Sequence, residues 1–187
     1  MTLTRRLATA IALALGAATL STSVLAEERT LQNPRVELAE VSGQAPNFKG
    51  ISTWLNSGPL NMSDLRGKVV MVNFWTYGCY NCVNTLPHVT GLHAKYKDKG
   101  LVIVGVHTPE FPFEKSTGNV QAALKRHGIL YPVAQDNDSA TWEAYRNRYW
   151  PAQYIVDQSG KIVYVHAGEG AYDESERTVQ NLLNVSS

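Results

Sequence analysis

Hydrophobic residues form two near-continuous runs in the middle of the chain, at Val69–Trp75 and Leu101–His107. Runs of this kind are typical of strands that are covered by helices on both faces of a sheet. Between them, apolar residues recur at helical spacing up to about Lys97, and Gly100 then ends the helix. A strand, a helix and a second strand in this order predict a parallel βαβ unit.

The second half of the chain continues the alternation of helices and strands. The turn residues Gln158–Gly160 separate two alternating segments and predict a hairpin. Asp138 is expected to cap a short helix, and Asp173 with Glu176 is expected to cap the last one. The elements therefore predict an α/β fold, with a parallel pair extended by an antiparallel hairpin and helices on both faces. In order, the expected elements are a helix at 120–127, a strand at 129–134, a short helix after 138, strands at 153–157 and 161–166, and a helix reaching 183.

The N-terminus has the pattern of a secretory signal peptide. Arg5 and Arg6 precede the apolar stretch Leu7–Leu20, and small residues follow at Val24–Ala26. The apolar stretch contains threonines and is short for a bilayer span of about 20 residues. We therefore expect cleavage after Ala26 rather than a retained anchor, and an extracytoplasmic, periplasmic location. The expected domains are a signal peptide at 1–26, a polar N-terminal arm at 27–48 and a folded domain at 49–187.

The charge of the chain does not favour a polyanionic partner. The net charge is +1, and losing the two arginines with the signal peptide would change it to about −1. This balance gives no reason to expect binding to nucleic acid or to an anionic membrane surface. The remaining chain is long enough for one domain with a sizeable core. We expect no membrane-spanning segment after signal cleavage.

Two cysteines, Cys79 and Cys82, lie three positions apart directly after the first predicted strand. This places Cys79 at the start of a helix, where free N–H groups and the helix dipole favour a thiolate. Cys82, one turn further on, would be sheltered and would resolve a mixed disulfide. The alternative is a structural disulfide, but closing so short a loop would stabilise the fold by only about 2 kcal/mol. The pattern therefore predicts redox chemistry.

Six stretches around these cysteines resemble a known family. They are Trp54–Asn56, Asp64–Val70, Phe74–Tyr77, Gly105–Phe111, Tyr149–Ala152 and Gly168–Gly170. Together they resemble the thioredoxin fold in its exported TlpA-like branch, and they are similar to the extracytoplasmic thioredoxin-like module of DipZ-type proteins. The resemblance covers about 50–183. It implies a three-layer α/β/α sandwich with a mixed central sheet and an N-terminal β extension.

The resemblance also implies a group that moves protons. Thioredoxin-like proteins often have a buried carboxylate on the strand before the CxxC motif, but Asn73 holds that position here and cannot titrate. In TlpA-like reductases a glutamate after the next strand can take this task. Glu110 lies at the matching place and is our candidate. The alternative is that Glu110 is a surface glutamate beside Pro109.

A further part of the expected site lies at Trp150–Pro151. The thioredoxin fold places a cis proline opposite the CxxC motif, and an X–Pro bond can adopt this form at little cost. The alternative is a trans proline that begins an edge strand. With a cis Pro151, the backbone of Trp150 would pair with an incoming chain. Tyr77 and Tyr80 flank the cysteines and are the other expected substrate contacts.

These features predict an exported thiol–disulfide oxidoreductase, more specifically a reductase or electron relay. It would need no cofactor, because the Cys79–Cys82 pair itself carries the electrons. Its partners would be exported protein thiols and disulfides. DipZ-type proteins usually carry this module behind a polytopic membrane electron carrier. Because no such domain is present in this sequence, we expect a separate membrane protein to be the electron source or sink.

Two other functions remain open. Thr76 lies three positions before Cys79, as in the T-x-x-C part of peroxiredoxins, so a thiol peroxidase is the first alternative. Val72 stands where that signature has a proline, so half of the signature is missing. The second alternative is a non-enzymatic module that binds a metal or an exported polypeptide. Such a module would keep its function without the two cysteines.

Metal and haem sites are not expected. His88 and His93 lie near the cysteines, so a zinc site with two histidines and two cysteines can be considered. Both histidines share one helix with Cys82, however, and four ligands would converge poorly. Val83 directly follows Cys82, where covalent haem attachment requires a histidine.

Overall fold

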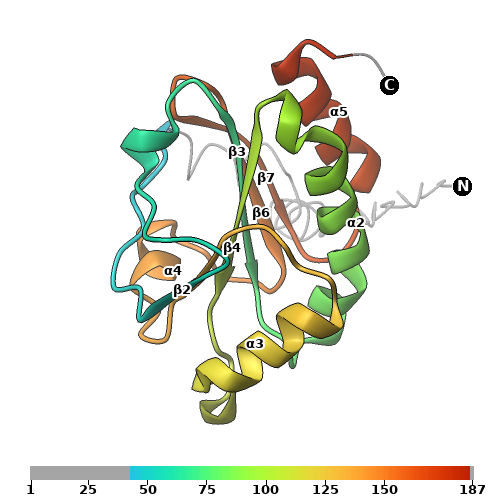
Figure 1. Ribbon diagram of the computed structural model, residues 1–187. Helices are drawn as coiled ribbons and strands as arrows, with labels where there is room; N and C mark the ends of the chain where they lie inside the picture. The colour runs from blue at the N-terminus through green and yellow to red at the C-terminus, as the bar shows by residue number, and fades with distance from the viewer. Residues whose placement is uncertain (1–42, 186–187) are drawn as a thin grey trace, which may run out of the picture. The chain divides into compact units, whose positions relative to one another are not determined.

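The structure is a computed structural model that describes residues 43–185. The predicted signal peptide and most of the predicted arm lie outside these residues. A mixed sheet of seven strands runs through the described domain (Figure 1), in the spatial order β1-β7-β6-β3-β4-β5-β2. The strands are β1 (Gly43–Gln44), β2 (Thr53–Leu55), β3 (Val69–Trp75), β4 (Leu101–His107), β5 (Val133–Gln135), β6 (Ala152–Val156) and β7 (Lys161–Ala167).

The centre of the sheet is the parallel pair that the sequence predicts. Strands β3 and β4 pair in parallel along their whole length, and every residue of β3 is buried. On the other side of β3, β6 and β7 form the predicted antiparallel hairpin. Strand β5 adds a third parallel strand beside β4, and β2 pairs antiparallel with β5. The fold is therefore the predicted mixed α/β sheet.

Helices cover both faces of the sheet and complete the three predicted layers (Figure 1). One face is covered by α2 (Tyr80–Tyr96), α3 (Thr117–Arg126) and α5 (Tyr172–Leu183). The other face is covered by the short helix α4 (Ala140–Ala144) and the 3-10 helix η2 (Met62–Leu65). Two more 3-10 helices are η3 (Lys97–Lys99) and η4 (Pro112–Lys115). Each face has its own hydrophobic core.

The predicted strand at 129–134 is largely wrong, because β5 begins only at Val133. Before Val133, the side chain of Asn56 donates hydrogen bonds to backbone carbonyl groups. Its Nδ2 donates to the carbonyl oxygens of Ile129 at 2.9 Å and Tyr131 at 3.0 Å. With its carbonyl groups already paired, this segment needs no neighbouring strand.

The two predicted helix caps are also wrong. At α4, the carboxylate of Asp136 accepts the N–H groups of Thr141 and Trp142 at 3.1 and 2.9 Å. Asp138 instead lies at the surface, 3.8 Å from the ammonium group of Lys115. At α5, the N-cap residue is Ala171, without a side-chain cap. Asp173 and Glu176 therefore lie inside the helix, in its first turn and beyond, rather than forming a capping box around its start.

The described end of the predicted arm is part of the domain. Strand β1 pairs with β7, so an N-terminal β extension is present as expected. Phe48 is buried and packs edge-on against Trp54, with ring centroids 5.4 Å apart. Within residues 43–185, none of the helices has the length and apolar character needed to cross a bilayer.

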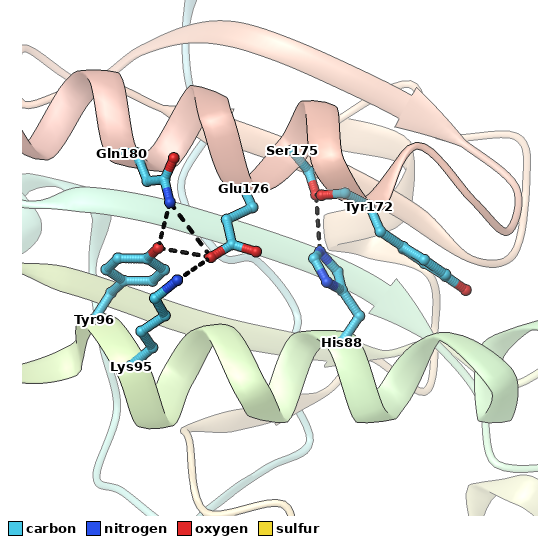
Figure 2. A network of polar contacts seen from close by, with 7 residues as sticks. All are labelled: His88, Lys95, Tyr96, Tyr172, Ser175, Glu176 and Gln180. Carbon is cyan, nitrogen blue, oxygen red and sulfur yellow. Dashed lines mark hydrogen bonds and ion pairs between the residues drawn. The ribbon is translucent and has the colours of Figure 1, made fainter. Parts of the chain in front are cut away.

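A polar network joins the helix of the two cysteines, α2, to the C-terminal helix α5 (Figure 2). Glu176 on α5 accepts hydrogen bonds from Lys95 and from the hydroxyl of Tyr96, each at 2.7 Å. Gln180 donates to the Tyr96 oxygen at 2.8 Å. About two turns closer to the cysteines along α2, a ring nitrogen of His88 lies 2.9 Å from the hydroxyl of Ser175. These contacts hold α2 in place along its length.

Candidate active site

The turn between β3 and α2 places the two cysteines. Strand β3 ends at Trp75 and α2 begins at Tyr80, with Cys79 as its N-cap residue. The Cys79 sulfur accepts the backbone N–H of Cys82 at 3.3 Å, as N-cap side chains do with the free N–H groups of a first turn. Both cysteines are free thiols in this structure. The first turn and the helix dipole thus favour negative charge on Cys79.

Burial distinguishes the two sulfurs. Cys79 is half-buried, whereas Cys82 is only 1% exposed. Burial raises the pKa of the Cys82 thiol far above its usual range, and the hydrogen bond with Cys79 raises it further, while a backbone hydrogen bond from Thr76 acts against both. Cys82 therefore stays protonated at neutral pH, and Cys79 is the accessible sulfur. This arrangement fits an attacking Cys79 and a resolving Cys82.

Glu110, the predicted proton-handling residue, lies on the loop after β4. Its side chain is exposed. Its charge contributes to the raised pKa of Cys82, as the smallest of the causes. The structure therefore brings Glu110 close enough to act electrostatically on the buried thiol, while its role in proton transfer stays a prediction.

Glu114 is a site residue that the sequence analysis missed. It is fully buried, and its Oε1 accepts the N–H of Gly78 at 2.9 Å. Its Oε2 accepts the N–H groups of Glu110 at 2.7 Å and Phe111 at 2.9 Å. Pro112 followed by Glu114 is a recognisable helix start, where a glutamate binds back to the N-cap N–H. That signal could have revealed the local contacts, but nothing in the sequence indicates the contact with Gly78.

His107, at the end of β4, lies fully buried beside the cysteine loop. Its Nε2 is 3.3 Å from the hydroxyl of Thr76, and its ring stacks on Tyr77 with centroids 5.5 Å apart. Burial lowers the pKa of His107 to about 4, although the charge of Glu114 acts in the opposite direction. The imidazole is therefore neutral at physiological pH. The Thr76 hydroxyl, which the peroxidase alternative would use, is buried against this ring.

The Trp150–Pro151 peptide bond is cis, as expected. The indole Nε1 of Trp150 donates to the carbonyl oxygen of Thr108 at 3.0 Å. The Trp150 ring packs on Trp142, with centroids 4.1 Å apart. The Pro151 carbonyl accepts the N–H of Gly168 at 2.7 Å. The backbone N–H and C=O of Trp150 take part in none of the backbone hydrogen bonds that the turns and loops of residues 43–185 form.

The two tyrosines that flank the cysteines differ in exposure. Tyr77 is half-buried, and its hydroxyl donates to the carbonyl oxygen of Phe113 at 3.0 Å. Tyr80 is 78% exposed, the largest exposed fraction among the large hydrophobic side chains described. Tyr77 is thus held between two loops, whereas Tyr80 is free to contact a partner. Their role in substrate binding stays a prediction.

The two histidines on α2 have separate surroundings. His88 faces α5, where its ring lies against Tyr172 with centroids 4.7 Å apart (Figure 2). His93 packs edge-on against Tyr131. In the part of the chain that the structure describes, no three or more His, Cys, Asp or Glu side chains are grouped so as to hold a metal ion.

Comparison with known proteins places this geometry in a family. The model of the AhpC/TSA family matches residues 41–165. The chain is 50% identical over 148 residues to DipZ of Mycobacterium bovis and of Mycobacterium tuberculosis, covering 78% of this chain but only 21% of each DipZ. It thus spans about a fifth of those relatives' length.

Two further proteins match over nearly their whole length. Thiol-disulfide oxidoreductase YkuV of Bacillus subtilis is 31% identical over 139 residues, which cover 74% of this chain and 93% of YkuV. The solution structure of a thioredoxin-like protein in the oxidised form superposes with a TM-score of 0.71 and 29% identity, covering 79% of this chain and 99% of that one. The chain therefore belongs to the AhpC/TSA family, has a thioredoxin-like fold and is related to thiol–disulfide oxidoreductases.

Proposed function

We propose that the chain is an exported enzyme that works as a reductase or electron relay through the Cys79–Cys82 pair. The observation that carries this proposal is the contrast between the two sulfurs. Cys79 caps α2 and is accessible, whereas Cys82 is buried and its pKa is raised. The signal-peptide pattern around Arg5 and Arg6 supports export. No bound cofactor is required, because the dithiol carries two electrons.

The exchange proceeds in two steps. The Cys79 thiolate attacks one sulfur of a partner disulfide, so a new S–S bond forms and the partner's second sulfur leaves as a thiolate that takes up a proton. Cys82 then loses its proton and attacks Cys79, which releases the partner's first sulfur as a thiol. The partner gains two electrons and two protons, and the enzyme is left with a Cys79–Cys82 disulfide. A separate membrane electron carrier is the proposed donor that reduces it again.

The partner chain would dock beside Trp150 and Pro151. The backbone N–H and C=O of Trp150 make none of the turn and loop backbone bonds found in residues 43–185, so they are the groups proposed to pair with an extended segment of the partner, as an exposed strand edge does. The exposed ring of Tyr80 lies next to the attacking sulfur in the sequence and offers an apolar contact. The proposed substrates are therefore exported polypeptides with accessible cysteines.

Glu110 is the proposed acceptor of the Cys82 proton in the second step. The high pKa of Cys82 makes this proton the difficult one to remove. Replacing Glu110 with Gln should slow release of the partner thiol by about 10²-fold at neutral pH, within the usual range for a lost general base. Stopped-flow measurement of the resolution step across pH tests this. Overlapping pH–rate curves for the variant and the wild type would show that Glu110 has no such role.

Trapping tests the function itself. A Cys82→Ser variant should accumulate mixed disulfides through Cys79, because the resolving thiol is gone. Non-reducing electrophoresis and mass spectrometry of the exported fraction should find polypeptides joined at Cys79. Cys79→Ser is the matched control and should trap nothing. Equal trapping by both variants, or none by either, would rule out the proposed exchange.

A further inference from the structure

Glu114 connects two loops that meet at the cysteines. Its side chain is fully buried, with 0% exposure. One carboxyl oxygen accepts the N–H of Gly78, the residue directly before the attacking cysteine. The other accepts the N–H groups of Glu110 and Phe111. Both oxygens thus act as acceptors, as those of a carboxylate do.

Gly78 leaves the space that this carboxyl group occupies. A Cβ atom added at Gly78 would overlap with Oε1 of Glu114, so any larger residue must displace the carboxyl group or the loop. The backbone of Gly78 has no positive φ that would by itself require glycine. The close approach of Glu114 is therefore the physical reason for a glycine at this position.

Within residues 43–185, Glu114 forms no ion pair with a cationic side chain. His107, whose pKa is influenced by Glu114, is neutral at physiological pH. The three N–H groups are the compensation for burying the carboxylate, because hydrogen bonds to a charged acceptor are the strong ones. Without the negative charge, the three buried N–H donors would lose their strong acceptor.

We propose that Glu114 is a positioning residue for the exchange reaction, which rests on the function proposed above. Its carboxylate fixes the loop of Cys79 against the loop of Glu110. The attacking sulfur and the proposed proton acceptor are thereby held in one geometry. The same negative charge lies one residue away from Cys79 through Gly78, so it also acts on the balance between the dithiol and disulfide forms of the enzyme.

The test compares two variants that break the same contact from opposite sides. Glu114→Gln keeps the shape of the side chain but turns a donor towards backbone N–H groups and removes the charge. Gly78→Ala keeps the charge but displaces the carboxyl group. Two quantities are measured for the full chain: the rate constant of the reduced protein with glutathione disulfide, and the equilibrium constant with glutathione. Glu174→Gln is the matched control, since Glu174 is exposed on α5.

Both variants should react about 10-fold to 100-fold more slowly, because a displacement of about 1 Å can cost 10²-fold. The double variant should react at most about twofold more slowly than the slower of the two single variants, because both changes remove the same contact. Only Glu114→Gln should move the glutathione equilibrium towards the dithiol, by at least about threefold, through the lost charge. The control should match the wild type in both quantities.

Other outcomes would overturn the proposal. If Glu114→Gln melts at a lower temperature but keeps the wild-type rate and equilibrium, Glu114 only stabilises the fold. If Glu114→Gln does not fold, Gly78→Ala decides, and an unchanged rate in that variant contradicts a positioning role. A wild-type protein that does not react with glutathione disulfide, while Cys82→Ser traps no polypeptide, would instead contradict the proposed function.

Discussion

Burial changes the chemistry of single side chains near the cysteines without changing their identity. His107 looks in the sequence like a titratable group at the end of a strand. In the structure it is 0% exposed and its pKa is lowered to about 4. It therefore cannot donate a proton at neutral pH. Its contribution is to pack against Tyr77 and to contact Thr76.

His107 makes the free energy of unfolding depend on pH in a defined direction. The folded pKa of His107, about 4, lies below the ordinary value of 6.5, so the unfolded chain binds more protons between these values. Stability should therefore fall as pH decreases from 6.5 towards 4, by about 2 kcal/mol between pH 7 and pH 5. In His107→Gln this part of the pH dependence should disappear. Urea unfolding at pH 7 and pH 5 measures this pH dependence, with His127→Gln as the control. Equal pH dependence in His107→Gln and the wild type would contradict the assignment.

At the scale of elements, α2 carries the site and α5 supports it. The cysteines lie at the N-terminal end of α2, which a short turn connects to the buried strand β3. Pairing of Glu176 with Lys95 and Tyr96 holds the opposite end of α2 (Figure 2). The sequence placed Glu176 in a capping box, because its spacing from Asp173 fits that motif. The helix packing instead gave Glu176 a partner on another element.

The contact between α2 and α5 should contribute measurably to stability. Replacing Glu176 with Ala leaves the buried hydroxyl of Tyr96 without its acceptor, which should cost about 1–2 kcal/mol at pH 7. Glu174→Ala on the same helix is the control and should cost less. The pKa of Glu176 is lowered by its bonds to Lys95 and Tyr96. Its contribution is therefore fully present above the ordinary glutamate pKa of 4.5 and is lost as pH falls further. Chemical denaturation at pH 7 and pH 3 should show the two variants converging at low pH.

At the scale of the whole molecule, the sheet is built from segments that are far apart in the sequence. Strand β1 pairs with β7, and β2 pairs with β5. Phe48, which we placed in the arm, is buried in the core under α4 and η2. Short edge strands carry few residues, so their pattern of hydrophobic positions is too brief to identify them. Their place is set by the backbone hydrogen bonds that the rest of the sheet offers.

The sequence by itself determined the centre of the protein. Strands β3 and β4 have the predicted bounds, because long runs of buried residues between turns are unambiguous. The cysteine pair was equally visible, since its chemistry depends on a local transition from strand to helix. The tertiary structure alone decided the bond between Glu114 and Gly78, the surroundings of His107 and the start of β5. Each of these depends on a contact between distant residues, such as Glu114 with Gly78 or Asn56 with Tyr131, and such contacts leave no periodic signal in the chain.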